Sequence, residues 1–311
     1  MSTRRSLYTF IAPRYWPVWI GMGLLRLLLF LPHRAGLFVG KLIGRLTHRL
    51  SASRRAVVRR NLELCFPDLD TEQRNQLARR HFEALGMSLV EMGLGRWASD
   101  KKIERLTTLE GVEHLNQALA AGEGVILLSA HFTTLEASGR ILALRSPGFD
   151  AVFRKNRSEF ITELQRTGRE RSAQLTIEKR DIKSMVRRLR EGHAVWYAPD
   201  QSYDRKGSAV IDFFGIPAMH TTATSTLARL GKARVVPFLP RRSADGRYHI
   251  RVYPALEDFP GKDPIADTER YISLLEEHIR TCPEQYFWIH RKFKNLPAGY
   301  PDYYSDLDAL K

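Results

Sequence analysis

The stretch GVILLSAHFTTLEASGRILAL, residues 124–144, places a histidine between an apolar run and a helical pattern. Residues 124–130 are rich in Val, Ile and Leu, which is typical of a strand that is buried on both faces of a sheet. Residues 133–144 have the spacing of a helix. His131 therefore lies at the carboxyl end of a strand, where α/β sheets bind their ligands.

The same alternation of strand and helix continues toward the C-terminus. The expected strands are 149–155, 173–178, 194–199, 233–240 and 248–256, the last as an antiparallel neighbour, and the expected helices are 158–171, 181–192 and 222–231. Another helix is expected over residues 70–94, where Asp70 and Gln73 have the spacing of a capping box. This order predicts the α/β class, with a mostly parallel central sheet flanked by helices.

The N-terminal region differs from the rest in charge. The first 62 residues contain no Asp or Glu but twelve Lys and Arg residues, and within them residues 15–31, YWPVWIGMGLLRLLLFL, have Arg26 as their only charge. This stretch is at the lower length limit for crossing a bilayer and begins with aromatic residues typical of the interface. We expect residues 1–35 to be an N-terminal membrane helix, spanning or lying in the interface, although a buried helix of a soluble protein is the alternative. More basic residues follow the stretch than precede it, which places residues 36–311 in the cytoplasm.

Composition narrows the classes of partner and cofactor. A net charge of +15 indicates an anionic partner, such as nucleic acid, a membrane surface, phosphorylated lipid or an acidic protein. The two cysteines, Cys65 and Cys282, are far apart and form no CxxC motif, so neither a disulfide framework nor a zinc site is expected. Without HExxH, Walker A or GxGxxG motifs, we expect no metal and no cofactor. The basic runs lack a nucleic-acid motif and favour anionic lipid as the partner.

His131 and Glu136 are candidates for a catalytic pair at the start of the predicted helix. A carboxylate that fixes the tautomer of an imidazole makes it a useful general base, and a helix start offers N–H groups to an oxyanion. The spacing alone decides nothing, because chance would give about one such pair in this composition. The alternative is that His131 caps the helix and Glu136 is a solvated first-turn acid. Asp200 ends a second strand, which favours a site, and the lack of GxSxG favours direct attack by a substrate hydroxyl.

Longer blocks of sequence carry a resemblance to a known family. His-x4-Asp/Glu after a strand resembles the signature of the lysophospholipid acyltransferase-like (glycerolphosphate acyltransferase) superfamily. The blocks GEGVILLSAHFTTLE, VFRKN, WYAPDQSYDRKGSAVIDFFG and QYFWIHRKFKNLP occur in this order. They resemble the late lauroyl/myristoyl acyltransferases of lipid A biosynthesis over nearly the whole chain. The chain has Glu where Asp is the other common residue of the pair, which the family permits.

The resemblance implies a single-pass enzyme of the bacterial inner membrane whose acyltransferase domain faces the cytoplasm. It would transfer a fatty acyl chain, with lauroyl as the first candidate, from acyl carrier protein to a 3-hydroxyacyl chain of a Kdo–lipid A precursor. His131 would be the base and Glu136 its orienting partner. Asp200 and Arg169 would bind substrate, with Arg154 as a rival to Arg169. A glycerolipid or glycolipid acyltransferase and a non-enzymatic membrane-surface protein are the alternatives.

Overall fold

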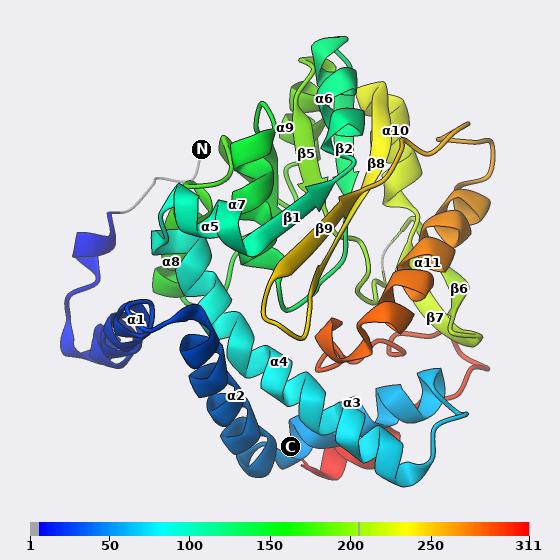
Figure 1. Ribbon diagram of the computed structural model, residues 1–311. Coiled ribbons are helices and arrows are strands. Elements are labelled where there is room, and N and C mark those ends of the chain that lie inside the picture. The colour runs from blue at the N-terminus through cyan, green and yellow to red at the C-terminus, as the bar shows by residue number, and fades with distance from the viewer. Residues whose placement is uncertain (1–5, 205, 311) are drawn as a thin grey trace.

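A central sheet of seven strands organises the described part of the molecule (Figure 1). The structure is a computed structural model that describes residues 6–204 and 206–310. Across the sheet, the strands are β1 (Thr107–Glu110), β9 (Tyr248–Val252), β8 (Ala233–Arg242), β2 (Gly124–Leu128), β5 (Ala194–Tyr197), β3 (Asp150–Phe153) and β4 (Leu175–Glu178). The five strands from β8 to β4 are parallel, and β9 is antiparallel to β8 and parallel to β1. The predicted class, α/β with a mostly parallel sheet, is confirmed.

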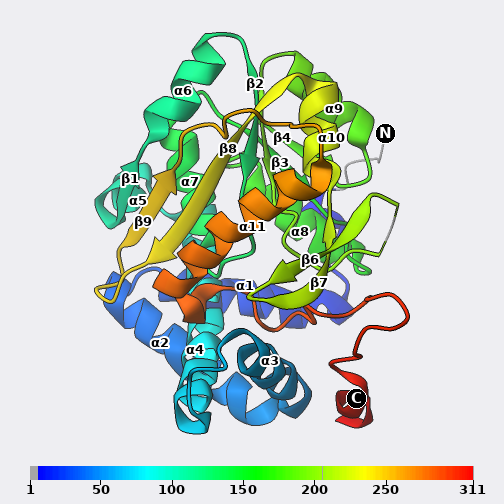
Figure 2. The ribbon, with the colours of Figure 1, turned by 90° about the vertical axis from the view of Figure 1, so that its right-hand side faces the viewer.

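The side chains of β2 explain why helices cover both faces. Val125 and Leu127 are buried in one apolar cluster, and Ile126 and Leu128 in a second, because successive strand residues point to opposite faces. The first face is covered by α5 (Asp100–Leu106), α6 (Val112–Ala120) and α7 (Leu135–Arg145). The second is covered by α9 (Ile182–Arg190), α10 (Ala223–Gly231) and α11 (Pro264–Thr281), as Figures 1 and 2 show. Outside these layers lie α8 (Glu159–Arg169) and the hairpin of β6 (Ser208–Phe213) and β7 (Ile216–Thr221).

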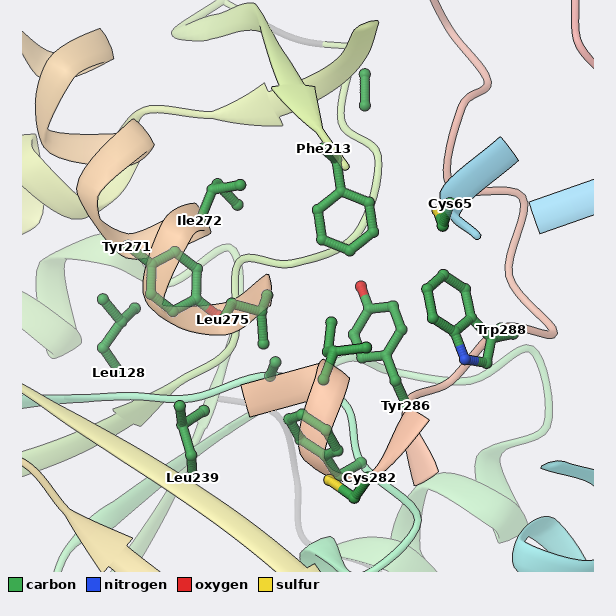
Figure 3. Close-up of a cluster of buried hydrophobic side chains, with 14 of the residues drawn as sticks. Cys65, Leu128, Phe213, Leu239, Tyr271, Ile272, Leu275, Cys282, Tyr286 and Trp288 are labelled. Atoms are coloured by element: carbon green, nitrogen blue, oxygen red, sulfur yellow. The ribbon is translucent and has the colours of Figure 1, made fainter. Parts of the chain in front are cut away.

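A cluster of aromatic side chains supports the second face close to the end of β2 (Figure 3). The rings of Tyr286 and Trp288 meet edge to face with centroids 4.8 Å apart, and Phe213 of the hairpin lies 5.9 Å from Tyr286. The Tyr271 hydroxyl on α11 donates a hydrogen bond of 2.7 Å to the Ser129 carbonyl. These contacts fix the backbone that leads from β2 to His131.

The apolar stretch of residues 15–31 does not form one long helix. It is divided between α1 (Trp16–Leu28) and a turn, after which α2 (His33–Leu50) begins. One apolar helix over the whole stretch is therefore not found, because Pro32 has no N–H to continue the helix and restricts the residue before it. The expectation that residues 1–35 attach the chain to a membrane stays a prediction. Within residues 6–204 and 206–310, no helix combines the length and the apolar character needed to cross a membrane.

Helix α2 packs tightly on the long helix α4 (Thr71–Trp97), which follows α3 (Ala52–Cys65). A Cβ atom on Gly86 of α4 would lie 2.0 Å from the Gly40 carbonyl oxygen, and one on Gly44 would lie 2.1 Å from the Phe82 carbonyl oxygen. Only glycine permits this approach of two helix backbones. The capping box predicted for α4 is confirmed by hydrogen bonds of 2.8 and 2.9 Å between residues 70 and 73.

Candidate active site

His131 and Asp200 meet at the carboxyl edge of the sheet. The strands β2 and β5 are parallel neighbours with Leu128 opposite Tyr197, and each functional residue follows three positions later. His131 Nδ1 and Asp200 Oδ1 are 2.6 Å apart, and the His131 backbone N–H donates to Asp200 Oδ2 at 3.2 Å. An ionised carboxylate only accepts hydrogen bonds, so Nδ1 carries the proton and Nε2 of the neutral ring is available to a substrate. The His131 side chain is 31% exposed.

The surroundings of Asp200 keep its carboxyl group charged. Burial alone would raise the pKa of Asp200, which is 1% exposed. The charge and hydrogen bonds of His131, together with the Lys292 ammonium, outweigh burial and lower this pKa to about 2. A buried carboxylate that remains ionised stabilises the imidazolium that forms when His131 takes a proton.

Lys292 is a site residue to which the sequence pattern gave no role. Its Nζ donates a hydrogen bond of 2.6 Å to the Asp200 carbonyl and lies 4.6 Å from the centre of the Phe213 ring. Burial lowers the pKa of Lys292 to about 8, although the charge of Asp200 opposes this shift. The residue belongs to the block QYFWIHRKFKNLP, and its position beside Asp200 depends on the return of the C-terminal segment to the sheet edge.

Glu136 has a different partner from the one predicted. Its Oε1 accepts hydrogen bonds from Nε and Nη2 of Arg169 at 3.1 and 2.8 Å, and no hydrogen bond joins it to His131 in the described part of the chain. The cause is the packing of α7. Its first turn is close to α4, where a Cβ on Gly95 would lie 2.8 Å from the Glu136 carbonyl oxygen, and the side chain meets the end of α8. The predicted contact between Glu136 and the imidazole is thus corrected, since Asp200 occupies that place.

Basic side chains extend the site along the sheet edge. Arg154 and Arg157 are exposed in the segment after β3, and Arg180 is exposed after β4. None of the three has a hydrogen bond or ion pair with another described residue, whereas Lys155 pairs with Glu178 at 3.1 Å. Parallel strands β2, β5, β3 and β4 bring this positive charge to the same edge as His131. The edge is therefore suited to an anionic substrate.

The C-terminal segment holds the loop that carries His131. The Phe287 N–H donates to the His131 carbonyl at 3.1 Å, and the Thr133 N–H donates to the Gln285 carbonyl at 2.9 Å. The Phe287 ring lies 6.4 Å from the His131 ring, and the His290 ring lies 6.3 Å from it. Beside them is a small pocket whose lining includes Asn61, Ser202, Trp288, His290 and Lys292. The loop that presents the imidazole is thus braced by backbone hydrogen bonds.

The chemistry present at this edge is that of a general base. A partly exposed histidine that is oriented by a buried carboxylate is suited to remove a proton from a hydroxyl group. Across residues 6–204 and 206–310, no group of three or more His, Cys, Asp and Glu side chains could hold a metal ion.

Comparison with known proteins identifies the type of reaction. Residues 5–295 match the family described as bacterial lipid A biosynthesis acyltransferase. The lipid A biosynthesis lauroyltransferase of Escherichia coli (strain K12) is 37% identical over 94% of this chain and 96% of its own length. The palmitoleoyltransferase of the same strain is 36% identical over 93% and 95%, and the myristoyltransferase 27% identical over 94% and 91%.

The fold, the histidine site and these matches together define an acyltransferase. More specifically, the chain belongs to the bacterial lipid A biosynthesis acyltransferase family, and the predicted resemblance is confirmed. It is an enzyme, which disfavours the non-enzymatic membrane-surface alternative. The same matches favour an acyltransferase of lipid A biosynthesis over the alternative of a glycerolipid or glycolipid acyltransferase.

Proposed function

We propose that the protein transfers a lauroyl chain from acyl carrier protein to a hydroxyl of a 3-hydroxyacyl chain on a Kdo–lipid A precursor. The observation that carries the proposal is the contact of 2.6 Å between His131 and the buried Asp200, which leaves Nε2 available at the sheet edge. The name of the relative that is 37% identical supports lauroyl as the acyl group.

In the first step, Nε2 of His131 removes the proton of the acceptor hydroxyl as its oxygen attacks the thioester carbonyl of the donor. A C–O bond forms and the carbonyl π electrons move to oxygen, which gives a tetrahedral oxyanion. Asp200 holds the ring in the reactive tautomer and stabilises the imidazolium. Backbone N–H groups at the start of α7, four residues after His131, are the proposed donors to the oxyanion.

In the second step, the oxyanion collapses and the C–S bond breaks. The leaving sulfur takes the proton from Nε2, so an ester and a free carrier thiol are released and His131 is neutral again. Glu136 supports this geometry in our proposal, because its ion pair with Arg169 joins the start of α7 to the end of α8. The enzyme needs no cofactor for these steps.

Charge supports both proposed partners. The donor protein is acidic and the acceptor carries phosphates and acidic sugars, whereas this chain has a net charge of +15. We assign Arg154 to the anionic groups of the acceptor, because it is exposed and lies on the same edge as His131. We also assign Arg169 to substrate contact, and its pair with Glu136 would hold it in position for this role.

We also propose the location. Residues 1–35 attach the chain to the bacterial inner membrane, and residues 36–311 form the acyltransferase domain on its cytoplasmic face. The apolar character of residues 15–31 and the basic residues around them support this arrangement.

The test is a transfer assay with lauroyl-acyl carrier protein and a tetra-acylated Kdo–lipid A precursor, read by mass spectrometry. We expect the acceptor to gain one lauroyl group, and myristoyl- and palmitoleoyl-carrier proteins to react more slowly. A wild-type enzyme that transfers none of the three groups to this acceptor contradicts the proposed function.

A further inference from the structure

Exposed large apolar side chains are concentrated near the N-terminus. Of 18 such side chains among the described residues, 12 lie between Tyr8 and Leu50. Those on the first two α-helices are Trp16, Ile20, Leu24, Leu27, Phe38, Leu42, Leu46 and Leu50, which we call the two-helix face. They recur every three or four residues, so each helix presents one apolar stripe. Exposed apolar stripes of this kind are typical of interaction sites.

The opposite sides of both helices are fixed to the rest of the protein. Helix α2 is held on α4 by the glycine contacts at Gly40 and Gly44. Leu25 of α1 is 8% exposed and packs at Gly93 of α4. Both views place α1 and α2 beside α4 and away from the sheet (Figures 1 and 2). The stripes therefore face outward, and no described part of the chain covers them.

The charge beside the stripes identifies the partner. Residues 6–62 include no acidic side chain, and α2 carries Arg34, Lys41, Arg45 and Arg49 next to its apolar stripe. Arg45 pairs with Glu83 of α4 at 2.7 Å, and the others extend the basic border. An apolar stripe bordered by cations fits the interface of an anionic bilayer. A second copy of the chain fits less well, because it would bring two positively charged faces together.

We propose that the two-helix face lies in the surface of an anionic bilayer, with the axes of α1 and α2 in the membrane plane. This inference rests on the proposed function, which requires a membrane-embedded acceptor. It extends the membrane contact beyond residue 35 to the end of α2 and makes α2 a docking element in its own right. The sheet edge with His131 then works on acceptors that reach it by lateral diffusion.

Flotation of the full chain with vesicles of phosphatidylethanolamine and phosphatidylglycerol, without substrate, tests the docking surface. The variant Leu42→Ser/Leu46→Ser removes apolar contact from α2. The matched control Leu230→Ser/Ile265→Ser changes side chains of similar exposure on α10 and α11, at 44% and 42% against 45% and 56%. We expect the apparent affinity to fall about tenfold or more for the α2 variant and less than about twofold for the control. Equal losses in the two variants contradict the proposal.

Labelling with a membrane-impermeant maleimide tests the orientation. The native thiols of Cys65 and Cys282 are buried, at 4% and 3% exposure, so single cysteines can be added by Ser6→Cys and Ala244→Cys. When protein is added to preformed vesicles, in-plane docking leaves both new cysteines outside, and both are labelled equally. Protection of the cysteine at position 6 alone would mean that the N-terminal segment crosses the bilayer, which contradicts the proposal.

These assays use no substrate, so their failure counts against the docking surface alone. Absence of acyl transfer by the wild-type chain in the mass-spectrometry assay counts against the proposed function alone. A third variant, Lys41→Gln/Arg49→Gln, separates charge from apolar contact. We expect it to weaken binding to phosphatidylglycerol vesicles several-fold and to leave binding to neutral phosphatidylcholine vesicles unchanged. Equal loss on both lipids contradicts the assignment to an anionic surface.

Discussion

Asp200 and Glu136, two acidic residues near His131 in sequence or in space, have different surroundings. The Asp200 side chain is 2% exposed and contacts the imidazole, whereas Glu136 is 33% exposed and pairs with Arg169, which is 21% exposed. Removing one member of a buried charged pair is costly, while pairs open to solvent contribute little. The partner of His131 is therefore not the acidic residue nearest to it in this stretch of sequence. It is Asp200, because β5 pairs with β2 and Asp200 follows the end of β5.

The largest loss of activity is expected when His131, the proposed base, is replaced. His131→Ala should lower kcat by about 10²–10⁴-fold, the usual contribution of a general base. The double variant His131→Ala/Asp200→Asn should be little worse, because residues that act as a unit do not give additive losses. The measurement is single-turnover acyl transfer, with folding checked by circular dichroism. Retention of more than about a tenth of wild-type turnover by His131→Ala would exclude the base role.

Asp200→Asn tests the contact between His131 and its buried carboxylate partner. We expect a loss of about 10²-fold, because an asparagine amide can donate to Nδ1 and so favours the tautomer that protonates Nε2. Glu136→Gln is measured in the same assay, because it too replaces a carboxylate with the corresponding amide. Should the Glu136 variant lose more activity than the Asp200 variant, Glu136 would be the orienting residue during turnover despite its contact with Arg169.

Activity should depend less on the partly exposed pair of Glu136 and Arg169. Glu136→Gln keeps one hydrogen bond to Arg169, and we expect a loss of at most about tenfold, as for a partly solvated pair. Arg169→Gln removes the same pair from the other side. If the pair only positions α7, the double variant should match the more affected single variant in kcat. If Arg169→Gln instead raises KM more than Glu136→Gln does and leaves kcat unchanged, Arg169 binds substrate.

The last prediction concerns stability and its dependence on pH, and it involves no change in turnover. The folded pKa of Asp200 is lowered to about 2 from an ordinary value of 3.8, so its contribution is present above pH 4 and disappears as the pH falls toward 2. The difference in free energy of unfolding between wild type and Asp200→Asn should narrow by about 2 kcal/mol between pH 5 and pH 2. Denaturant titrations at several pH values measure it, and a constant difference would contradict the ion pair.

The pattern of the sequence predicted most elements of the sheet core. The helix expected over residues 181–192 is α9, where Asp181 accepts a hydrogen bond of 3.0 Å from the Ser184 N–H and Gly192 follows the helix with a φ of 79°. Strand β1 and the pairing of β6 with β7 were not predicted. Strand β1 pairs with β9, more than a hundred residues away, and such a partner leaves no local signal.

The sequence named His131 and Asp200 as candidate site residues, but it did not predict that they contact each other. His131 and Asp200 each follow a strand by the same number of residues, but their meeting depends on β5 being the neighbour of β2. Strand order comes from crossovers that periodicity does not encode. The contact of Glu136 with Arg169 likewise depends on how α7 and α8 pack. Lys292 reaches Asp200 only because the C-terminal segment returns to the sheet edge.

The bracing of the His131 loop by residues 285–287 has a consequence for synthesis on the ribosome. Chains fold in the order in which they emerge, and α1 and α2 emerge first. The backbone partners of His131 and Thr133 are among the last thirty residues, and so is Lys292. A growing chain thus exposes its proposed membrane contacts long before its histidine is fixed. In our proposal, the nascent chain can therefore contact the membrane before residues 285–292 complete the histidine site.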